Sequence, residues 1–137
     1  MTRLSLPSLH ATHAGIWIAA DGEVREATRG EAISRLAETP HILLNAPLIG
    51  QRLGTPEVSG LDLLELFAFV HPARFAVPTV AGMSRAMGIE PPVGESEAAA
   101  TLIAIAEALL ARLGDAEWPE REGAWTSNAT LVRLGWA

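Results

Sequence analysis

Hydrophobic and polar positions divide the first third of the chain into short extended segments. Residues 14–20 (AGIWIAA) are apolar around one large aromatic side chain, and residues 23–27 (EVREA) alternate between polar and apolar positions. Between them stands Asp21-Gly22, a dipeptide that favours tight hairpin turns because it tolerates positive φ. Residues 41–44 (HILL) are apolar after the first position, which is typical of a strand buried on both faces. We therefore expect a hairpin and an inner strand.

The pattern between and after these strands is helical. Thr28 and Glu31 have the capping-box spacing at the start of a helix over residues 30–38, and Pro47 suits the first turn of a short helix over 47–53. Further helices are expected over residues 62–70, with Asp62 as the cap, and over residues 80–87, with Thr79 as the cap. The longest helix is expected over residues 96–113, where Leu102, Ile105, Leu109 and Leu113 share one face. Ser127 or Asn128 is expected to cap a last short helix. This mixture predicts an α/β (α+β) fold, a small mixed sheet flanked by helices.

Composition narrows the class of protein. The 137 residues fit one domain, and 49% apolar with 19% charged residues is typical of a folded core. No apolar run approaches the roughly 18 residues of a membrane span, and the N-terminus is a poor signal peptide, so a cytoplasmic protein with no membrane partner is expected. The absence of cysteine excludes a disulfide framework and a thiolate nucleophile. The net charge of −6 argues against non-specific DNA binding, and without lysine there is no phosphate-binding Walker A loop.

Few residues suggest chemistry on their own. His10 and His13 have the i, i+3 spacing that lets two helical histidines share a metal, but no clear third ligand lies nearby. A pair of histidines that lie on the surface or have their hydrogen bonds satisfied is the favoured interpretation. His41 and His71 are better explained by hydrogen bonds to the backbone. Among the acids, Asp62 is best explained as a helix cap. Glu95 and Glu97 begin the longest helix, where the helix dipole favours acids.

The order of segments carries more information than single residues. HILLNAPLIGQRL, then SGLDLLELFAFVHPARFAVPTVAGMSRAMGIEPP, then ESEAAATLIAIAEALLARL, resembles the second half of DEDD-type 3′–5′ exonuclease domains. Asn45 matches the Asn of that family's His-Asn-x-x-Phe-Asp turn, and Asp62 lies in its Leu-Asp-Thr-Leu-Glu-Leu element. Glu97 matches the metal-binding Asp of its Asp-Ala-x-Ala-Thr helix. The resemblance implies a ribonuclease H-like, exonuclease-like scaffold over about residues 41–113.

The chain departs from the exonuclease pattern at the positions that bind metal or take part in catalysis in that family. The metal-binding Asp of the turn falls on Ile49, no histidine precedes Glu97 at the family spacing, and the first Asp-x-Glu motif has no match in GIWIAADGEV. Two-metal catalysis needs several carboxylates to hold and neutralise the ions. Asn45, Ile49, Asp62 and Glu97 therefore form an expected relic of the exonuclease site, with no catalytic residues, no metal ligands and no cofactor of their own. If Ile49 points into the core and no acids cluster near Asn45, that interpretation stands.

A wider resemblance concerns the whole chain. LHATHAGIWIA, HILLNAPLIGQRLG, SGLDLLELFAFVHPARFAVPT and WPEREGAWTS look like the N-terminal region of DinG-type ATP-dependent DNA helicases. The resemblance implies that residues 1–137 are one accessory domain, with a tryptophan-rich tail over 113–137 leading toward a motor domain outside this chain. ATP and Mg²⁺ would belong to that motor. The implied partners are the motor of the same protein and single-stranded DNA, and the implied process is DNA repair.

Two alternatives to this accessory domain remain open. The first is an active metal-dependent 3′–5′ exonuclease with a non-standard acid set built from Asp62, Glu65 and Glu97. The second is a stand-alone protein-interaction module, for which the acidic net charge of −6 is the best support.

Overall fold

The fold is a mixed sheet of short strands connected by helices. The computed structural model describes residues 6–55, 58 and 60–113. The strands of that part are β1 (Ser8–Ala11), β2 (Ile16–Ala20), β3 (Glu23–Ala27), β4 (Ile42–Leu43) and β5 (Leu61–Asp62). Its helices are α1 (Arg29–Glu38), α2 (Ala46–Leu53), α3 (Leu63–Val70), α4 (Val80–Ala86) and α5 (Glu95–Leu113).

The sheet combines antiparallel and parallel strands. Its order is β3-β2-β1-β4-β5, with β1–β2 and β2–β3 antiparallel and β1–β4 and β4–β5 parallel. A sheet flanked by helices was expected from the sequence, and the mixed α/β class is confirmed. Because β1, β4 and β5 run in the same direction, their carboxyl ends point to one edge of the sheet.

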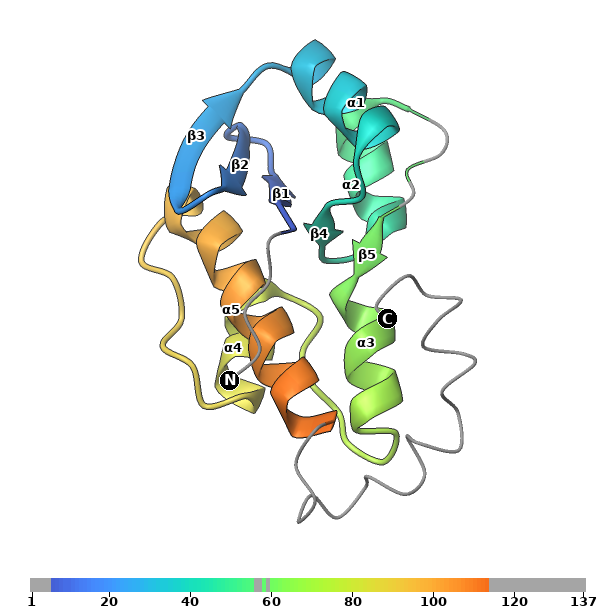
Figure 1. The fold of residues 1–137 in the computed structure, drawn as a ribbon, viewed down its shortest axis with the longest axis vertical. Helices are drawn as coiled ribbons and strands as arrows, with labels where there is room; N and C mark the ends of the chain where they lie inside the picture. The colour runs from blue at the N-terminus through green and yellow to red at the C-terminus, as the bar shows by residue number, and fades with distance from the viewer. Residues whose placement is uncertain (1–5, 56–57, 59, 114–137) are drawn as a thin grey trace.

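Helices cover both faces of the sheet. Side chains of β4 alternate, so that Ile42 packs with α3, α4 and α5 while Leu43 packs with α1 and α2. Figure 1 shows α5 running beside the sheet together with α3 and α4, and α1 and α2 lying together at its other side. Leu102, Ile105, Leu109 and Leu113, the predicted apolar face of α5, are all buried in this core. The two clusters make the inner strands apolar on both faces.

The local signals in the sequence act as expected. Asp21 and Gly22 have φ values of 54° and 80°, so the hairpin between β2 and β3 uses the positive φ that this dipeptide tolerates. The side chain of Thr28 caps α1 by accepting from the Glu31 amide, and Thr79 caps α4 in the same way. The predicted last helix at Ser127 or Asn128 and the tryptophan-rich segment lie outside the described residues.

The structure contains two strands that the sequence analysis did not predict. Residues 8–11 form β1 in the middle of the sheet, so His10 lies on a strand and His13 in the following turn. The helical i, i+3 spacing therefore does not apply to this pair. β5 is only two residues long and was read as the start of a helix. No helix in the described part of the chain is long and apolar enough to cross a bilayer.

Candidate functional site

The candidate site is the edge of the sheet at which β1, β4 and β5 end. β4 leads directly into Asn45 and α2, β5 ends at Asp62, and β1 leads into the turn of residues 12–15. In open α/β sheets, ligands bind outside the carboxyl ends of the strands, where neighbouring connections leave in different directions. The chain thus places two of the four relic residues, Asn45 and Asp62, at the edge where ligands are expected.

Asn45 shapes the connection from β4 to α2. Its backbone is left-handed, with φ 68° and ψ 77°, a conformation that asparagine tolerates better than most residues. Its side-chain oxygen accepts a hydrogen bond from the amide of Leu48 at 3.3 Å, which caps the new helix. Asn45 therefore has a structural role, because it forms the turn after β4 and caps α2.

Asp62 lies beside Asn45 and accepts hydrogen bonds from three backbone amides. Its Oδ1 accepts from the amides of Asn45 at 2.9 Å and Leu64 at 3.0 Å, and its Oδ2 accepts from the amide of Ala46 at 2.7 Å. The side chain thus caps α3, as predicted, and also joins the start of α3 to the β4–α2 turn. The relic interpretation required that no acids cluster near Asn45, and among the described residues this one carboxylate accepts a hydrogen bond from its amide without forming a group of acids there. Three amide donors use its oxygens, so it stands as a structural bridge.

Ile49 is in the core, as the relic interpretation required. It is 3% exposed and packs with Leu9, Leu43 and Leu53 between α2 and the sheet. An isoleucine in this place contributes about 2 kcal/mol by apolar burial and has no atom that binds a cation. The position that matches the exonuclease turn Asp therefore serves packing.

The remaining acids do not complete a metal site. Glu97 is exposed on the first turn of α5, and Glu65 is exposed on α3. Within residues 6–55, 58 and 60–113, no three His, Asp or Glu side chains gather closely enough to hold a metal ion. The alternative of an active exonuclease uses Asp62, Glu65 and Glu97 as a non-standard acid set, whereas in the structure the buried Asp62 accepts hydrogen bonds from three backbone amides.

A histidine and a glutamate meet beside the same edge. His10 Nε2 on β1 lies 3.4 Å from Glu95 Oε2 at the start of α5, and the His10 ring lies 6.3 Å from that of Trp17. Burial lowers the pKa of His10 below its usual 6.5, Glu95 acts to raise it, and the positive charge of Arg52 lowers it again. His10 thus lies next to the last residue of β1, near the end of the strand where the exonuclease pattern has acids. The first strand expected from the sequence covers residues 14–20, so the sequence did not indicate this position.

A groove opens between α2 and the turn that follows β1. It has a volume of about 620 Å³ and is lined by Thr12, His13, Leu48, Gln51 and Arg52. The three α2 residues are spaced so that they share one helix face. Arg52 Nη1 donates to the Ala11 carbonyl oxygen at 2.6 Å, which ties α2 to the end of β1. No carboxylate lines this groove.

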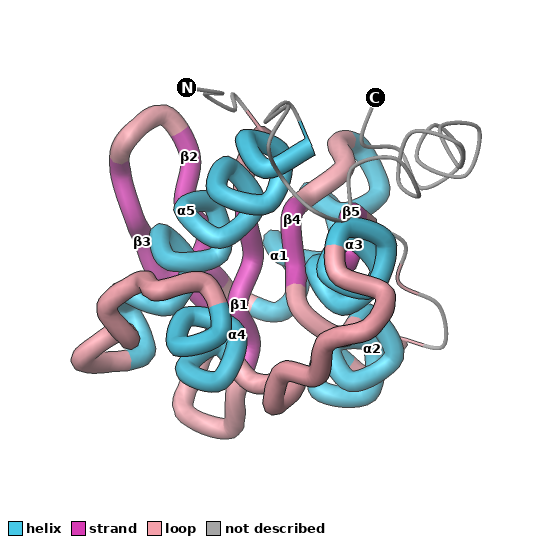
Figure 2. The backbone as a smooth tube through the Cα atoms, turned by 90° about the horizontal axis from the view of Figure 1, so that it is seen from below, coloured by secondary structure: helices cyan, strands magenta, loops and turns pink. Residues whose placement is uncertain are grey.

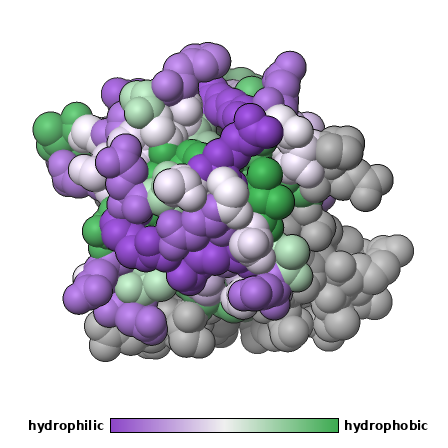
Figure 3. All heavy atoms as spheres, turned by 90° about the horizontal axis from the view of Figure 1, so that it is seen from above, coloured by the Kyte–Doolittle hydropathy of each residue, from purple (hydrophilic) through white to green (hydrophobic). Residues whose placement is uncertain are grey.

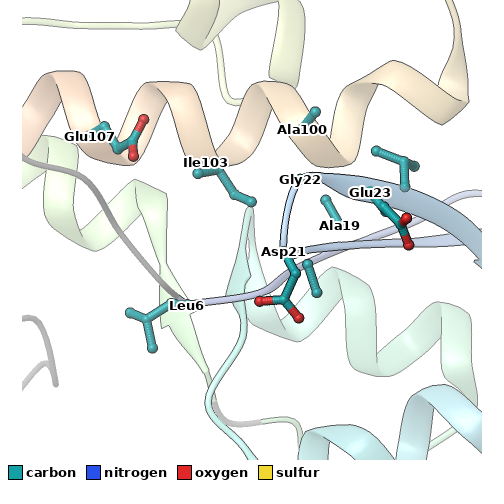
Figure 4. Close-up of a pocket in the computed structure, with 10 residues that line it drawn as sticks. Leu6, Ala19, Asp21, Gly22, Glu23, Ala100, Ile103 and Glu107 are labelled. Atoms are coloured by element: carbon teal, nitrogen blue, oxygen red, sulfur yellow. The ribbon is translucent and has the colours of Figure 1, made fainter.

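A second groove lies at the opposite end of the sheet, between the β2–β3 hairpin and α5. Its volume is about 680 Å³, and Figure 4 shows Ile103 reaching from α5 toward the hairpin, with Asp21, Glu23 and Glu107 around the opening. Figure 2 shows this hairpin turn at one end of the strands (upper left). The groove combines apolar walls with acidic residues and lies at the amino end of β1.

The last two histidines are buried for structural reasons. His41 is 0% exposed, and its Nδ1 donates to the Thr39 carbonyl oxygen at 2.7 Å, as predicted, while Nε2 has no hydrogen-bond partner among the described residues. Burial lowers the pKa of His41. His71 packs against Phe67, and its Nε2 accepts from Arg112 Nη1 at 2.6 Å, which joins the end of α3 to the end of α5.

The molecular surface over the α1 side is polar. Figure 3 shows that the face seen from above is mostly hydrophilic, with apolar residues in small separate areas. Most α1 residues are exposed or half-buried, and Ala32 alone among them is buried. A broad apolar contact surface is therefore not found on this face.

Comparisons with protein-family models, with curated proteins and with solved structures found no match for this chain.

Proposed function

We propose that this chain is a non-catalytic, exonuclease-like accessory domain of an ATP-dependent DNA helicase. Its task would be to position DNA or a protein partner, or to regulate the motor, while ATP and Mg²⁺ act in the motor domain. The observation that carries this proposal is how the side chains at the carboxyl edge of the sheet are used. Asp62 is committed to three backbone amides and Ile49 is packed in the core, at the turn whose sequence resembles an exonuclease site.

The topology supports the scaffold part of the proposal. The sheet has three antiparallel strands followed by two parallel ones, in the order β3-β2-β1-β4-β5, which is compatible with the small mixed sheet that the resemblance to exonuclease domains implies. The helix after β5 begins at the Asp62 cap, as the resemblance to the Leu-Asp-Thr-Leu-Glu-Leu element implies. A fold of this kind is a scaffold for many functions, so the proposed activity rests on the site and not on the fold.

Exposed apolar side chains support a role in contacting a partner. Phe75 is 84% exposed and Val77 is 52% exposed, both in the connection between α3 and α4. A large exposed aromatic residue of this kind is enriched in protein interfaces. This connection is the proposed point of contact with the motor, and this part of the proposal does not depend on the strand edge.

The first test concerns catalysis. The 137-residue chain is incubated with 3′-labelled single-stranded DNA in Mg²⁺ or Mn²⁺, beside the Glu97→Ala variant. We expect the DNA to remain intact. Metal-dependent cleavage by the wild type that disappears in Glu97→Ala would refute the proposal and support the exonuclease with a non-standard acid set.

The second test concerns the motor. Reading the coding frame beyond Ala137 for a Gly-Lys-Thr/Ser loop establishes whether a motor is encoded. The parent protein is then compared with a version that lacks residues 1–137, and ATPase rate and affinity for single-stranded DNA are measured. We expect at least one of them to change. An unchanged rate and affinity would favour a stand-alone protein-interaction module.

A further inference from the structure

We infer that the groove between α2 and the β1–β2 turn binds a phosphate group. The groove is defined by Thr12, His13, Leu48, Gln51 and Arg52. The inference rests on the proposed function only for the carrier of the phosphate, which we take to be a nucleotide or single-stranded DNA. Three independent features of the groove lead to it, namely its chemistry, its charge and its position.

The chemistry of the lining matches an anion. Thr12 supplies a hydroxyl, Gln51 an amide and His13 a ring N–H, and Arg52 supplies a guanidinium with five N–H donors. One of these five, on Nη1, is used by the Ala11 carbonyl oxygen, so the group is held in place while its other donors remain for a ligand. The planar guanidinium fits phosphate oxygens in a two-point contact.

The charge of the groove opposes that of the chain. The protein carries a net charge of −6, but no carboxylate lines this groove. Among the described residues Arg25 contacts Glu31 and His10 contacts Glu95, and no such carboxylate contact is found for the Arg52 guanidinium. The second groove shows the contrast, because Asp21, Glu23 and Glu107 around it would repel a phosphate.

The position of the groove favours a ligand. It lies at the carboxyl end of β1, the edge at which open α/β sheets bind ligands. Both walls are fixed, since Arg52 bonds the end of β1 and the turn is closed by a hydrogen bond from the Thr12 amide to the Gly15 carbonyl oxygen at 2.9 Å. Fixed donors lose little freedom when a ligand binds, which favours affinity.

The experiment titrates the isotope-labelled 137-residue chain with inorganic phosphate, thymidine 5′-monophosphate and oligothymidylate, and follows the backbone amides by NMR. We expect saturable shifts at Thr12, His13 and the α2 residues of the groove, and binding that weakens as salt is added. Tighter binding of the nucleotide or the oligonucleotide than of inorganic phosphate identifies a nucleic-acid carrier. Equal binding of all three identifies free phosphate as the ligand. Shifts that are absent, or that centre on other residues, overturn the inference.

Variants separate the groove from general charge. Arg52→Gln should weaken phosphate binding by about tenfold or more, because it removes a charge-assisted contact. Gln51→Glu places a negative charge at an exposed helix position and should weaken it comparably without disturbing the core. Arg85→Gln, which removes an exposed arginine on α4, is the matched control and should leave binding unchanged. Wild-type binding by Gln51→Glu would refute the inference even if Arg52→Gln fails to fold.

The outcomes remain distinct from those of the proposed function. Phosphate binding that depends on Arg52, in a parent protein whose motor does not respond to loss of residues 1–137, would support this inference and refute the accessory role. A motor that responds to the loss of residues 1–137, together with a groove that binds none of the three probes, would support the accessory role and refute this inference.

Discussion

Asp62 accepts a hydrogen bond on Oδ1 from the backbone amide of Asn45 at 2.9 Å, although the two residues are 17 positions apart in the chain. The contact joins the end of β4 to the start of α3, and the Ala46 amide strengthens it by donating to Oδ2 at 2.7 Å. One buried carboxylate thus fixes two connections at the edge where a ligand is expected. Hydrogen bonds from three backbone amides to this carboxylate hold the edge together.

The first prediction tests this bridge. Asp62→Asn should lower the free energy of unfolding by about 2–4 kcal/mol, because the new amide group faces backbone donors that the carboxylate had satisfied. Glu65→Gln, an exposed change on the same helix, is the control and should stay within about 0.5 kcal/mol. Urea denaturation measures both. A stability gain of the wild type in Mn²⁺ that Asp62→Asn abolishes would instead identify Asp62 as a metal ligand.

The second prediction concerns the residue that replaced the expected acid. Ile49→Asp should destabilise the fold by about 3 kcal/mol or more, since it puts a carboxylate into an apolar cluster with no partner there. Ile49→Val keeps the shape and should cost about 0.5–1.5 kcal/mol. Thermal unfolding followed by circular dichroism distinguishes them. An Ile49→Asp protein as stable as the wild type would show that this position is not part of the core.

The third prediction separates the two roles of Asn45. Asn45→Ala loses the cap to the Leu48 amide and also places a Cβ-bearing residue without a local hydrogen bond at φ 68°, so it should cost about 1.5–3 kcal/mol. Asn45→Gly loses the cap but tolerates the backbone, and should be about 1 kcal/mol less costly than alanine. Equal losses for the two variants in a denaturation series would contradict the assigned strain.

The fourth prediction is a dependence of stability on pH. Burial lowers the pKa of His41 below 6.5, so the folded state binds fewer protons than the unfolded state at pH values between the two. Stability should therefore be lost as the pH falls below about 6.5, and the loss should level off below the folded pKa.

His41→Asn tests the origin of this slope. Asparagine keeps a donor for the Thr39 carbonyl oxygen but has no titration in this range, so the variant should show a smaller loss of stability between pH 7 and pH 5. Ser34→Asn, an exposed change on α1, adds no titrating group and should retain the wild-type slope. Urea unfolding at a series of pH values provides the comparison, and identical slopes for His41→Asn and the wild type would assign the dependence to other groups.

Sequence reasoning located the elements whose signals are local. The Asp21-Gly22 turn, the caps at Thr28, Asp62 and Thr79, and the buried face of α5 each follow from a few neighbouring residues. For the candidate site, the sequence also indicated that Asn45 ends an inner strand and that Ile49 points into the core.

Tertiary structure decided what depends on distant partners. β1 and β5 have no local pattern that the sequence analysis assigned to a strand, and they exist as strands because β1 pairs with β2 and β4, and β5 with β4. That pairing places His10 on a strand and His13 in the following turn, which the spacing of the two histidines does not reveal. The contact of Asp62 with Asn45 and the groove beside Arg52 likewise arise only when segments far apart in the chain meet. Local hydrogen bonds and hydrophobic periodicity depend on neighbouring residues and can be predicted from the sequence. The order of the strands and the geometry of the site result from packing between segments that are far apart in the chain.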